Sequence, residues 1–575
     1  MMSASSNSTA IVPVWPAAES LGLPVGFEMT SAGVEYIGSN GSKVWLCSKL
    51  IVTSTFRDLL GNGWGRLVEV TDRDGMIHYL PLTDADLTSK WTAMLRRLID
   101  AGLRTQTDPS SKKALQRLLL KWQPARCQTS TSSVGWVGQD GKAFVFGTGK
   151  VVGNLDVLPM NLTTSPSSSA HVEQGTLDEW RAEVGALCKG NDILILAVST
   201  ALAGVLLDFL DLDLGGGLHL KGASSQGKST ALRVATSVWG SPDATCSWRA
   251  TSNGLEVLAA SLNGTFLPLD ELGEVDGRHL NDVLYCLANG VGKTRMTASQ
   301  DMGATKRWRV SVLSTGEISI ATKLAEGGKR QMAGQMVRLL DVTADGQRFG
   351  AFDELHGAPD AAAFADRLKR ATRVQHGTAA VAFVRELIAR SNKRDEIRSL
   401  VQRLSESFRS NVEAGISGVV GRAADRFAVI AIAGELATTH GITGWNCGEA
   451  TLAAKQAFIA WHETRTDSMI DAMEPLLSKI SEFCLNGSNA VVRFGSEPDE
   501  GVMPAAWEDD RLIYLPTETW HMLFPDAAGR AAAMVLREGG ILLPGEGENL
   551  MRKASDPRRG RQRYYTIIKQ RIKLR

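Results

Sequence analysis

The sequence predicts an α/β protein with a parallel sheet at its centre, a small α+β domain before the sheet, and a helical region with a further small domain after it. Three observations support this prediction. A glycine-rich loop, residues 222–229, follows the short apolar strand 217–221 and precedes a helical pattern. A second apolar strand ends in two carboxylates, Asp270 and Glu271. Strand and helix patterns then alternate from 215 to about 345, as they do in parallel sheets.

Length and composition limit the class of protein. A chain of 575 residues is too long for one hydrophobic core, so about three or four domains are expected. The net charge of +1 means that any nucleic-acid surface must come from local clusters of cations. The seven cysteines lack C-x-x-C or zinc spacing, which is typical of reduced thiols in a cytoplasmic protein. The N-terminus has no signal-peptide pattern, and the apolar stretch 193–210 predicts a buried helix and no membrane span.

The first part of the chain predicts a compact α+β domain. Residues 1–32 read as a flexible tail, and residues 33–160 contain short apolar strands separated by Gly, Asn and Asp turns. Helical patterns occupy 86–102 and 111–121 within this domain. The stretch TTSPSSS at 163–169 predicts a linker to the next domain, which is expected to span 174–350.

The glycine-rich loop GASSQGKS matches G-x-x-x-x-G-K-[ST] at every fixed position. In this motif the backbone N–H groups hold phosphate oxygens, the lysine reaches the β- and γ-phosphates, and the hydroxyl binds Mg²⁺. The helix that follows points its positive end at the same anion. The alternative is a Gly/Ser-rich loop that matches by chance. The predicted ATP-binding residues are Gly222, Ser225, Gln226, Gly227, Lys228, Ser229 and Thr230.

Hydrolysis of a bound nucleotide needs a second, acidic site, and the apolar run 265–269 supplies it because Asp270 and Glu271 follow directly. Asp270, with Ser229, is predicted to hold Mg²⁺, and Glu271 to polarise the attacking water. Pro268 is unusual for a central strand, since proline lacks the ladder donor. The alternative for the acidic pair is a solvated turn.

The next strong strand, 308–315, ends in the hydroxyls of Ser314 and Thr315. In oligomeric ATPases of the AAA+ type a polar side chain at this point senses the γ-phosphate, so both residues are candidates. Arg330 and Arg338 follow, and either could be an arginine finger that reaches a neighbouring subunit's γ-phosphate. The alternative for each arginine is a surface salt bridge.

Residues 290–309 predict a basic β-hairpin just before this strand. Lys293, Arg295, Lys306 and Arg307 are its candidate contacts to the phosphate backbone of DNA. The alternatives are a solvated hairpin or arginines that serve the ATP site.

The last part of the chain predicts a helical lid or bundle at 351–475 and, after a short linker, a winged helix at 478–575. From 552 to 575 there are ten Lys/Arg residues and one acid, Asp556. Phosphate contacts are predicted for Arg558, Arg559, Arg561 and Arg563 in the wing. The alternative is a solubilising basic tail.

Several of these motifs together carry a family resemblance: the phosphate loop, LPLDELGE at 267–274, STGE at 314–317, Gly334-Gln335 with Arg338, and RFA at 426–428. The chain resembles the domain-of-unknown-function family numbered 927, found in replication proteins of phages, prophages and integrative elements, including the helicases of staphylococcal cassette chromosome elements. The resemblance implies a P-loop AAA+ ATPase core related to MCM-like helicases. It also implies ATP and Mg²⁺ between the subunits of a hexameric ring that moves on DNA.

The resulting hypothesis is an ATP-dependent DNA helicase or translocase of a phage or mobile element. Its expected partners are single-stranded or forked DNA, other copies of the chain, and a separate primase or other replication proteins. Two alternatives stay open. One is a replication initiator or loader, and the other is a DNA-binding regulator that uses ATP as an assembly switch.

Overall fold

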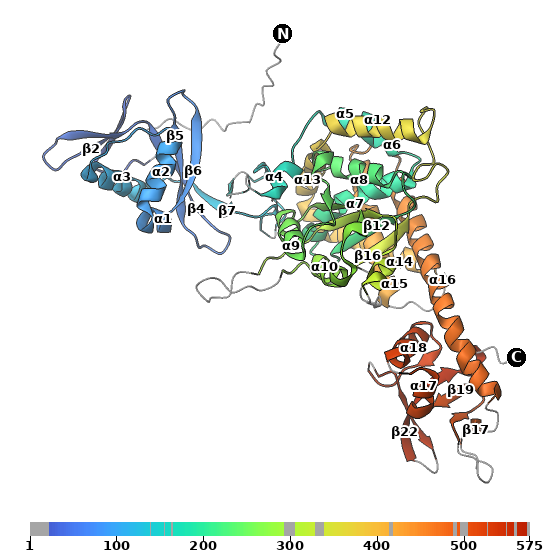
Figure 1. Ribbon diagram of the computed structural model, residues 1–575. Coiled ribbons are helices and arrows are strands. Elements are labelled where there is room, and N and C mark those ends of the chain that lie inside the picture. Colours follow the sequence, from blue (N-terminus) through green and yellow to red (C-terminus); the bar gives the residue numbers. More distant parts are fainter. Residues whose placement is uncertain are drawn as a thin grey trace.

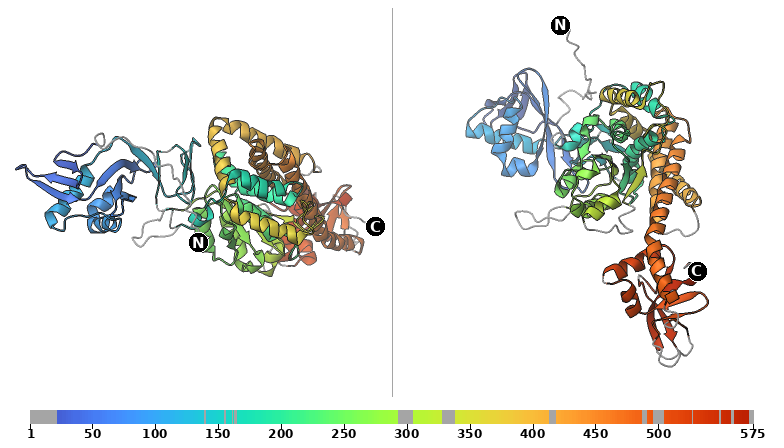
Figure 2. Two further views of the ribbon diagram at one scale, coloured as in Figure 1. Left: turned by 90° about the horizontal axis from the view of Figure 1, so that it is seen from above. Right: turned by 45° about the vertical axis from the view of Figure 1, so that its right-hand side comes forward.

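The computed structural model shows three lobes in Figures 1 and 2. The N-terminal lobe is blue, the central lobe runs from green to yellow, and the C-terminal lobe is red and joined to the centre by the long helix α16 (Glu449–Asn486). The structure describes residues 22–575 except 139, 155, 161, 163–164, 293–304, 328–337, 413–417, 487–490, 495–503, 526, 548, 557–559 and 572–575.

The N-terminal lobe combines two sheets with three helices. The three-stranded sheet has the order β1-β2-β3 and the five-stranded sheet the order β11-β7-β4-β5-β6. Side chains at period-2 positions of the strands meet the apolar faces of the helices in one core. The strands are β1 (Phe27–Thr30), β2 (Gly33–Ile37), β3 (Lys43–Cys47), β4 (Leu50–Arg57), β5 (Gly65–Thr71), β6 (Ile77–Thr83), β7 (Cys127–Thr131) and β11 (Val157–Pro159). The helices are α1 (Asp84–Ser89), α2 (Trp91–Asp100) and α3 (Pro109–Lys121).

Three expectations for this region differ from the structure. Strand β1 lies inside the predicted tail 1–32, because Phe27 pairs with Tyr36 and is buried. The helix predicted at 86–102 is two helices, α1 and α2, since the backbone leaves the helical conformation at Lys90. The predicted linker 163–169 overlaps helix α4 (Pro166–Ala170), where proline stands at the start of a helix, a position that suits it.

A small antiparallel sheet lies between the N-terminal and central lobes. Its strands are β8 (Gly135–Trp136), β9 (Ala143–Val145) and β10 (Val151–Gly153), in the order β10-β9-β8. The indole Nε1–H of Trp136 donates to the carbonyl of Val205 at 3.1 Å. This contact fastens the small sheet to the central lobe.

The central lobe is built on a parallel sheet with the order β13-β14-β15-β12-β16. Every pair of neighbouring strands in it is parallel. Its strands are β12 (Gly216–Lys221), β13 (Cys246–Ser247), β14 (Phe266–Asp270), β15 (Ser311–Gly316) and β16 (Leu339–Thr343). The loops after β12, β14 and β15 therefore leave the sheet at the same edge. Pro268 is accommodated in β14 because β13 pairs only with Leu269 and Asp270, so proline's missing N–H breaks no bond on that side.

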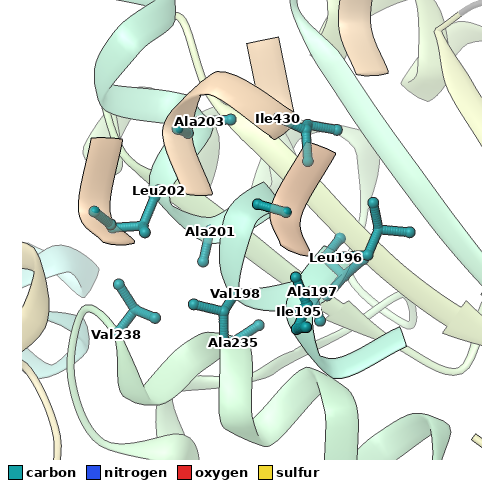
Figure 3. Packing of buried hydrophobic residues seen from close by; sticks show 14 of the residues in the cluster. Ile195, Leu196, Ala197, Val198, Ala201, Leu202, Ala203, Ala235, Val238 and Ile430 are labelled. Carbon is teal, nitrogen blue, oxygen red and sulfur yellow. The ribbon is translucent and has the colours of Figure 1, made fainter. Parts of the chain in front are cut away.

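Helix α7 (Asp192–Phe209) forms the middle of the largest core. Within the described residues it is the one helix long and apolar enough to cross a membrane, and 89% of it is buried inside the protein. Figure 3 shows Val198 and Leu202 of α7 beside Ala235 and Val238, with Ile430 from a later helix on the other side. The predicted apolar stretch is thus a core helix, and it packs the helix after the phosphate loop against the rest of the lobe.

Further helices of the central lobe flank the sheet and lead to the long helix α16. They are α5 (Leu177–Trp180), α6 (Ala186–Cys188), α8 (Lys228–Ser237), α9 (Ser252–Ser261), α10 (Gly277–Asn289), α11 (Ile320–Glu326), α12 (Ala361–Val374), α13 (Thr378–Ala389), α14 (Arg394–Arg409) and α15 (Gly418–Thr439). Helix α16 continues through Pro475 and through the predicted linker at 475–478. The linker prediction is wrong because Met473 and Ile480 are both buried in the C-terminal core, and tertiary packing outweighs the low helix propensity of proline.

The C-terminal lobe consists of two helices against a six-stranded sheet. The sheet order is β17-β18-β19-β22-β20, with β21 paired to β22 as a hairpin. Among the described residues of this lobe, strands β17, β18 and β19 precede the two helices. The elements are β17 (Val491–Arg493), β18 (Ala506–Glu508), β19 (Leu512–Leu515), α17 (Thr517–Leu523), α18 (Ala527–Glu538), β20 (Leu542–Leu543), β21 (Arg552–Asp556) and β22 (Gly560–Ile568).

Candidate nucleotide site and basic surfaces

The glycine-rich loop connects the carboxyl end of β12 to the first residue of α8, Lys228. Gly227 has a φ of 95°, and a Cβ atom added there would lie 2.8 Å from the ring of Phe352. A Cβ atom added at Gly222 would lie 2.8 Å from Cγ of Asp345. Both fixed glycines of the motif are therefore required by backbone conformation or by close packing.

The polar groups of the loop are arranged for an anion and a hard cation. Lys228 is 7% exposed, and its Nζ donates to the carbonyls of Gly222 at 2.8 Å and Ala223 at 2.6 Å. Ser229 is exposed, and its Oγ lies 3.4 Å from Oδ1 of Asp270. Thr230 is buried, which leaves its backbone N–H as the group it can offer to a phosphate. The ammonium group thus folds back over the loop, while the hydroxyl faces the acidic strand.

A segment after β16 holds the loop from the other side, and sequence reasoning missed it. The N–H of Ala223 donates to Oδ2 of Asp345 at 2.7 Å, and the N–H of Ala351 donates to the carbonyl of Gln226 at 2.8 Å. The same segment is fixed to the start of α7, where Oδ1 of Asn191 accepts the N–H groups of Asp353 at 2.8 Å and Glu354 at 3.0 Å. Residues 345–354 carry no motif, so only the folded chain reveals this contact.

The acidic pair lies at the same edge of the sheet, two strands away from the loop. Asp270 accepts a short hydrogen bond from the hydroxyl of Thr315, and the N–H of Glu271 donates to that hydroxyl at 3.4 Å. Glu271 has a φ of 58°, a conformation that costs a non-glycine residue roughly 1–3 kcal/mol. Its Oε1 accepts the N–H of Gly273 at 3.2 Å. The pair is therefore held in a strained turn that Thr315 helps to fix.

The structure separates the two candidate sensor residues. Thr315 contacts Asp270 directly, whereas Ser314 is fully buried on the other side of β15. The Ser314 hydroxyl lies 2.9 Å from Nδ1 of His219 and accepts from Nε1 of Trp248 at 2.8 Å. The Ser314 hydroxyl is therefore engaged by two buried partners, and its sensor role stays a prediction that this arrangement does not favour. Thr315 is the candidate that keeps the predicted position.

The directions of these buried hydrogen bonds can be derived from their partners. Nε2 of His219 lies 3.0 Å from the carbonyl of Ile318, so Nε2 must carry the proton. Nδ1 is then an acceptor, and the Ser314 hydroxyl donates to it while accepting from Trp248. Burial lowers the pKa of His219 to about 4, which keeps the ring neutral. We call His219, Ser314 and Trp248 the buried chain; it joins strands β12 and β15 to the segment before the acidic strand.

The candidate arginine fingers lie elsewhere. Arg330 lies outside the described residues. Arg338 directly precedes β16, with its guanidinium 3.9 Å from the ring centre of Tyr285, and burial lowers the pKa of Arg338. Because β12 and β16 are parallel, Arg338 lies at the edge of the sheet opposite the phosphate loop. Arg426 is buried nearby and donates to the carbonyl of Gly215. Burial, with Arg338 and Arg422 close by, lowers the pKa of Arg426 to about 10.

The structure describes only the base of the predicted basic β-hairpin at residues 290–309, which we call the core hairpin. Lys293 and Arg295 lie outside the described residues. Val291 and Arg307 form an antiparallel bridge, and both Lys306 and Arg307 are exposed. Arg309 has a different role from its neighbours, since it pairs with Asp208 at 3.3 Å, Asp211 at 2.6 Å and Asp213 at 3.4 Å.

The predicted wing is the hairpin of β21 and β22. Arg558 and Arg559 lie outside the described residues, whereas Arg561 and Arg563 are exposed on β22. The register places Lys553 opposite Arg563, and Arg561 lies two residues along on the same face. Like charges directly opposite each other destabilise a sheet unless an anion lies between them. Lys553 thus joins the basic face of the hairpin, although the sequence analysis did not select it.

The predicted Mg²⁺ ligands fit the chemistry of that ion. Ser229 and Asp270 offer hard oxygen donors, and Mg²⁺ normally takes one or two protein ligands together with phosphate oxygens and water. Within the part of the chain that the structure describes, no group of three or more His, Cys, Asp or Glu residues could hold a metal by itself. The residues present therefore suit a metal that arrives with a nucleotide.

The fold and the site define a mixed α/β protein with a parallel sheet. A solved structure named "SCCmec type IV Cch - active helicase" is similar to this chain with a TM-score of 0.65 and 20% sequence identity, covering 94% of this chain and 97% of that one. Residues 27–307 match the family described as "Domain of unknown function (DUF927)". No curated protein matches the sequence.

The buried chain yields a first prediction, on stability. Ser314→Ala would leave the indole N–H of Trp248 and Nδ1 of His219 without their partner in a buried place. We expect the free energy of unfolding of the central lobe to fall by about 1–3 kcal/mol or more, measured by chemical denaturation. Ser410→Ala, at an exposed helix end, is the control and should change little. Equal stability of the two variants would contradict a stabilising role for the hydrogen bonds of the buried chain.

Proposed function

We propose that the protein is an ATP-dependent DNA helicase or translocase of a phage or mobile element, with a P-loop AAA+ core that acts as a hexameric ring in DNA replication. The observation that carries the proposal is the meeting of Lys228, Ser229, Asp270 and Thr315 at one edge of the parallel sheet. These groups match the needs of phosphoryl transfer, which depends on positioning and on neutralising charge.

Each residue has a defined task in this mechanism. Lys228 would exchange its two loop carbonyls for phosphate oxygens, and the N–H groups of residues 225–230 would hold the remaining oxygens. Mg²⁺ held by Ser229 and Asp270 would neutralise the β- and γ-phosphate charge. Glu271 would release the N–H of Gly273 and turn its carboxylate to the attacking water. Thr315, already bonded to Asp270, would report the state of the γ-phosphate to β15.

The position of Arg338 supports a site shared between subunits. An arginine at the opposite edge of the sheet cannot reach the phosphate loop of its own chain, because the strands lie between them. In a ring that edge can face the loop of the next copy. Arg330 is retained as the second candidate from sequence.

Two basic surfaces support DNA as the partner. They are the base of the core hairpin, with Lys306 and Arg307, and the wing face with Lys553, Arg561 and Arg563. The C-terminal lobe as a whole is proposed to be a winged helix. The similar solved structure is named an active helicase, which agrees with this direction of the proposal.

One observation favours the alternatives in which ATP drives assembly and not unwinding. These are a DNA-binding regulator that uses ATP as an assembly switch and a replication initiator or loader. The carboxylate of Glu271 is engaged with the N–H of Gly273. If it stayed there after ATP bound, the site would bind the nucleotide and hydrolyse it poorly. The next experiment separates these functions.

Replacement of Glu271 by Gln tests the motor. The amide cannot act as a base, so we expect the rate of ATP hydrolysis to fall by about 10²–10⁴-fold while ATP binding is kept. Lys228→Ala is the comparison and should lose binding itself. The measurements are phosphate release and fluorescent-nucleotide binding, with unwinding of forked DNA. If Glu271→Gln unwinds DNA at the wild-type rate, the helicase proposal is refuted. If the wild-type protein hydrolyses ATP faster with DNA but separates no strands, the initiator or loader alternative is favoured.

A mixing experiment tests whether Arg338 acts on a neighbour. Arg338→Ala should lower hydrolysis by roughly 10³-fold, as loss of an arginine finger does. Mixed with the Glu271→Gln variant, it should regain part of the activity, because some interfaces then combine an intact Arg338 with an intact Glu271. Lys369→Ala, an exposed cation on α12, is the control. If mixed oligomers form but regain no ATP hydrolysis, Arg338 does not act at the nucleotide site of the neighbouring subunit.

Neutralising the wing tests DNA contact. The triple variant Lys553→Gln, Arg561→Gln and Arg563→Gln should bind DNA more weakly, and the slope of log affinity against log salt should fall by about 2–3, since each phosphate contact contributes about 0.7–0.9. Hydrolysis without DNA should not change. A matched variant, Lys369→Gln, Arg398→Gln and Lys393→Gln, removes equal charge from the central lobe. Equal effects of the two variants would argue against a specific wing contact.

A further inference from the structure

Helix α3 of the N-terminal lobe has an unusual charge pattern. Its sequence, PSSKKALQRLLLK, contains four cations and no acid. Leu115, Leu118 and Leu119 are buried in the core of the lobe. Lys113, Arg117 and Lys121 are exposed and follow each other at four-residue spacing, so they lie on one solvent face. We call these three residues the α3 basic face.

Pairing with acids does not explain the α3 basic face. Like charges four residues apart repel each other on a helix surface. None of the three cations has an ion pair among the described residues, and nearby acids are engaged elsewhere. Glu28 pairs with Lys43 at 2.5 Å, and Asp108 caps the start of α3 by accepting the N–H of Ser111 at 2.9 Å. The face is therefore an uncompensated row of positive charge.

The central cation of this row is held in place. The guanidinium of Arg117 lies 5.0 Å from the ring centre of Tyr36 and 5.7 Å from that of Phe27. Cation–π contacts of this kind orient the planar group and reduce its freedom before any partner binds. A guanidinium positioned in this way suits a phosphate group, because it can donate two parallel hydrogen bonds to two of the phosphate oxygens.

We propose that the α3 basic face binds the phosphate backbone of DNA. From Lys113 to Lys121 the helix rises about 12 Å, at about 1.5 Å per residue. At about 3.4 Å per phosphate along one strand, this length spans about three phosphates. Figure 1 shows α3 on the N-terminal lobe, apart from the central lobe and the wing. The inference rests on the proposed function, and it adds a contact that extends the DNA footprint to the first lobe.

The test uses the full chain with Lys113, Arg117 and Lys121 all changed to Gln. Binding to labelled single-stranded and duplex DNA is measured by fluorescence anisotropy over a range of salt concentrations. We expect the salt slope to fall by about 2 for single strands, or by nearly 3 for duplex, because three phosphate contacts are lost. The form of DNA whose slope falls by its own expected amount is the one that α3 contacts.

A matched control removes equal charge from the same lobe. Lys43, Arg73 and Lys90 are exposed, and Lys43 and Lys90 are paired with acids. Their triple change to Gln should leave the salt slope close to that of wild type. A second variant, Lys113→Gln with Lys121→Gln, spares the aromatic contacts of Arg117 and should still lose about 1.4–1.8 in slope, so that it tests the face even if the triple variant folds poorly.

The outcomes separate this inference from the proposed function. If wild type binds DNA and the α3 variants bind it with an unchanged slope, the α3 proposal is overturned and the helicase proposal stands. An equal fall for the Lys43, Arg73 and Lys90 variant also overturns it, because net charge would then explain the loss. If wild type itself neither binds DNA nor hydrolyses ATP faster with DNA, the proposed function fails first.

Discussion

The parallel pairing of β12, β14 and β15 is the constraint on which the candidate site depends. Lys228, Asp270 and Thr315 are far apart in the sequence, and they meet because parallel strands end at a common edge. The hydrogen bonds between the strands set their register, and the buried chain of His219, Ser314 and Trp248 adds side-chain bonds across it. A shift of one residue in β15 would put Ser314 where Thr315 lies and turn Thr315 into the core.

The loop that faces this edge is supported from both sides. Helix α7 packs against α8 beneath the loop, and residues 345–354 bind the loop through Asp345 and Ala351. Asn191 joins these two supports, because its amide holds the segment at the point where α7 begins. The loop is thereby joined by hydrogen bonds to residues 345–354 and, through them, to the start of α7. In the proposed function, these contacts would give nucleotide binding a physical route to the helical region.

Charge is distributed over the molecule in a way that the overall balance hides. The net charge of +1 reflects nearly equal numbers of cations and acids, 63 and 62, some of which pair locally, as Arg309 does with three aspartates. The wing and the α3 basic face depart from this pattern, since their cations are aligned on one face. Both surfaces lie outside the central lobe. In the proposed function, a single DNA segment could therefore contact the protein at more than one lobe.

The sequence by itself determined the phosphate loop, the acidic strand, the buried nature of α7 and the helical region, because each depends on local spacing or on a long apolar pattern. Tertiary structure alone decided the rest. Ser314 and Thr315 both carry a hydroxyl group, so the sequence does not distinguish them. They differ because their side chains lie on opposite faces of β15. Asp345 and Asn191 carry no motif, since their roles come from contacts across more than a hundred residues. The sequence predicts a short linker between about 475 and 478, yet packing against the C-terminal core keeps the helix continuous through Pro475. Local patterns report local geometry, whereas which side chains meet across the sheet depends on how the whole chain packs.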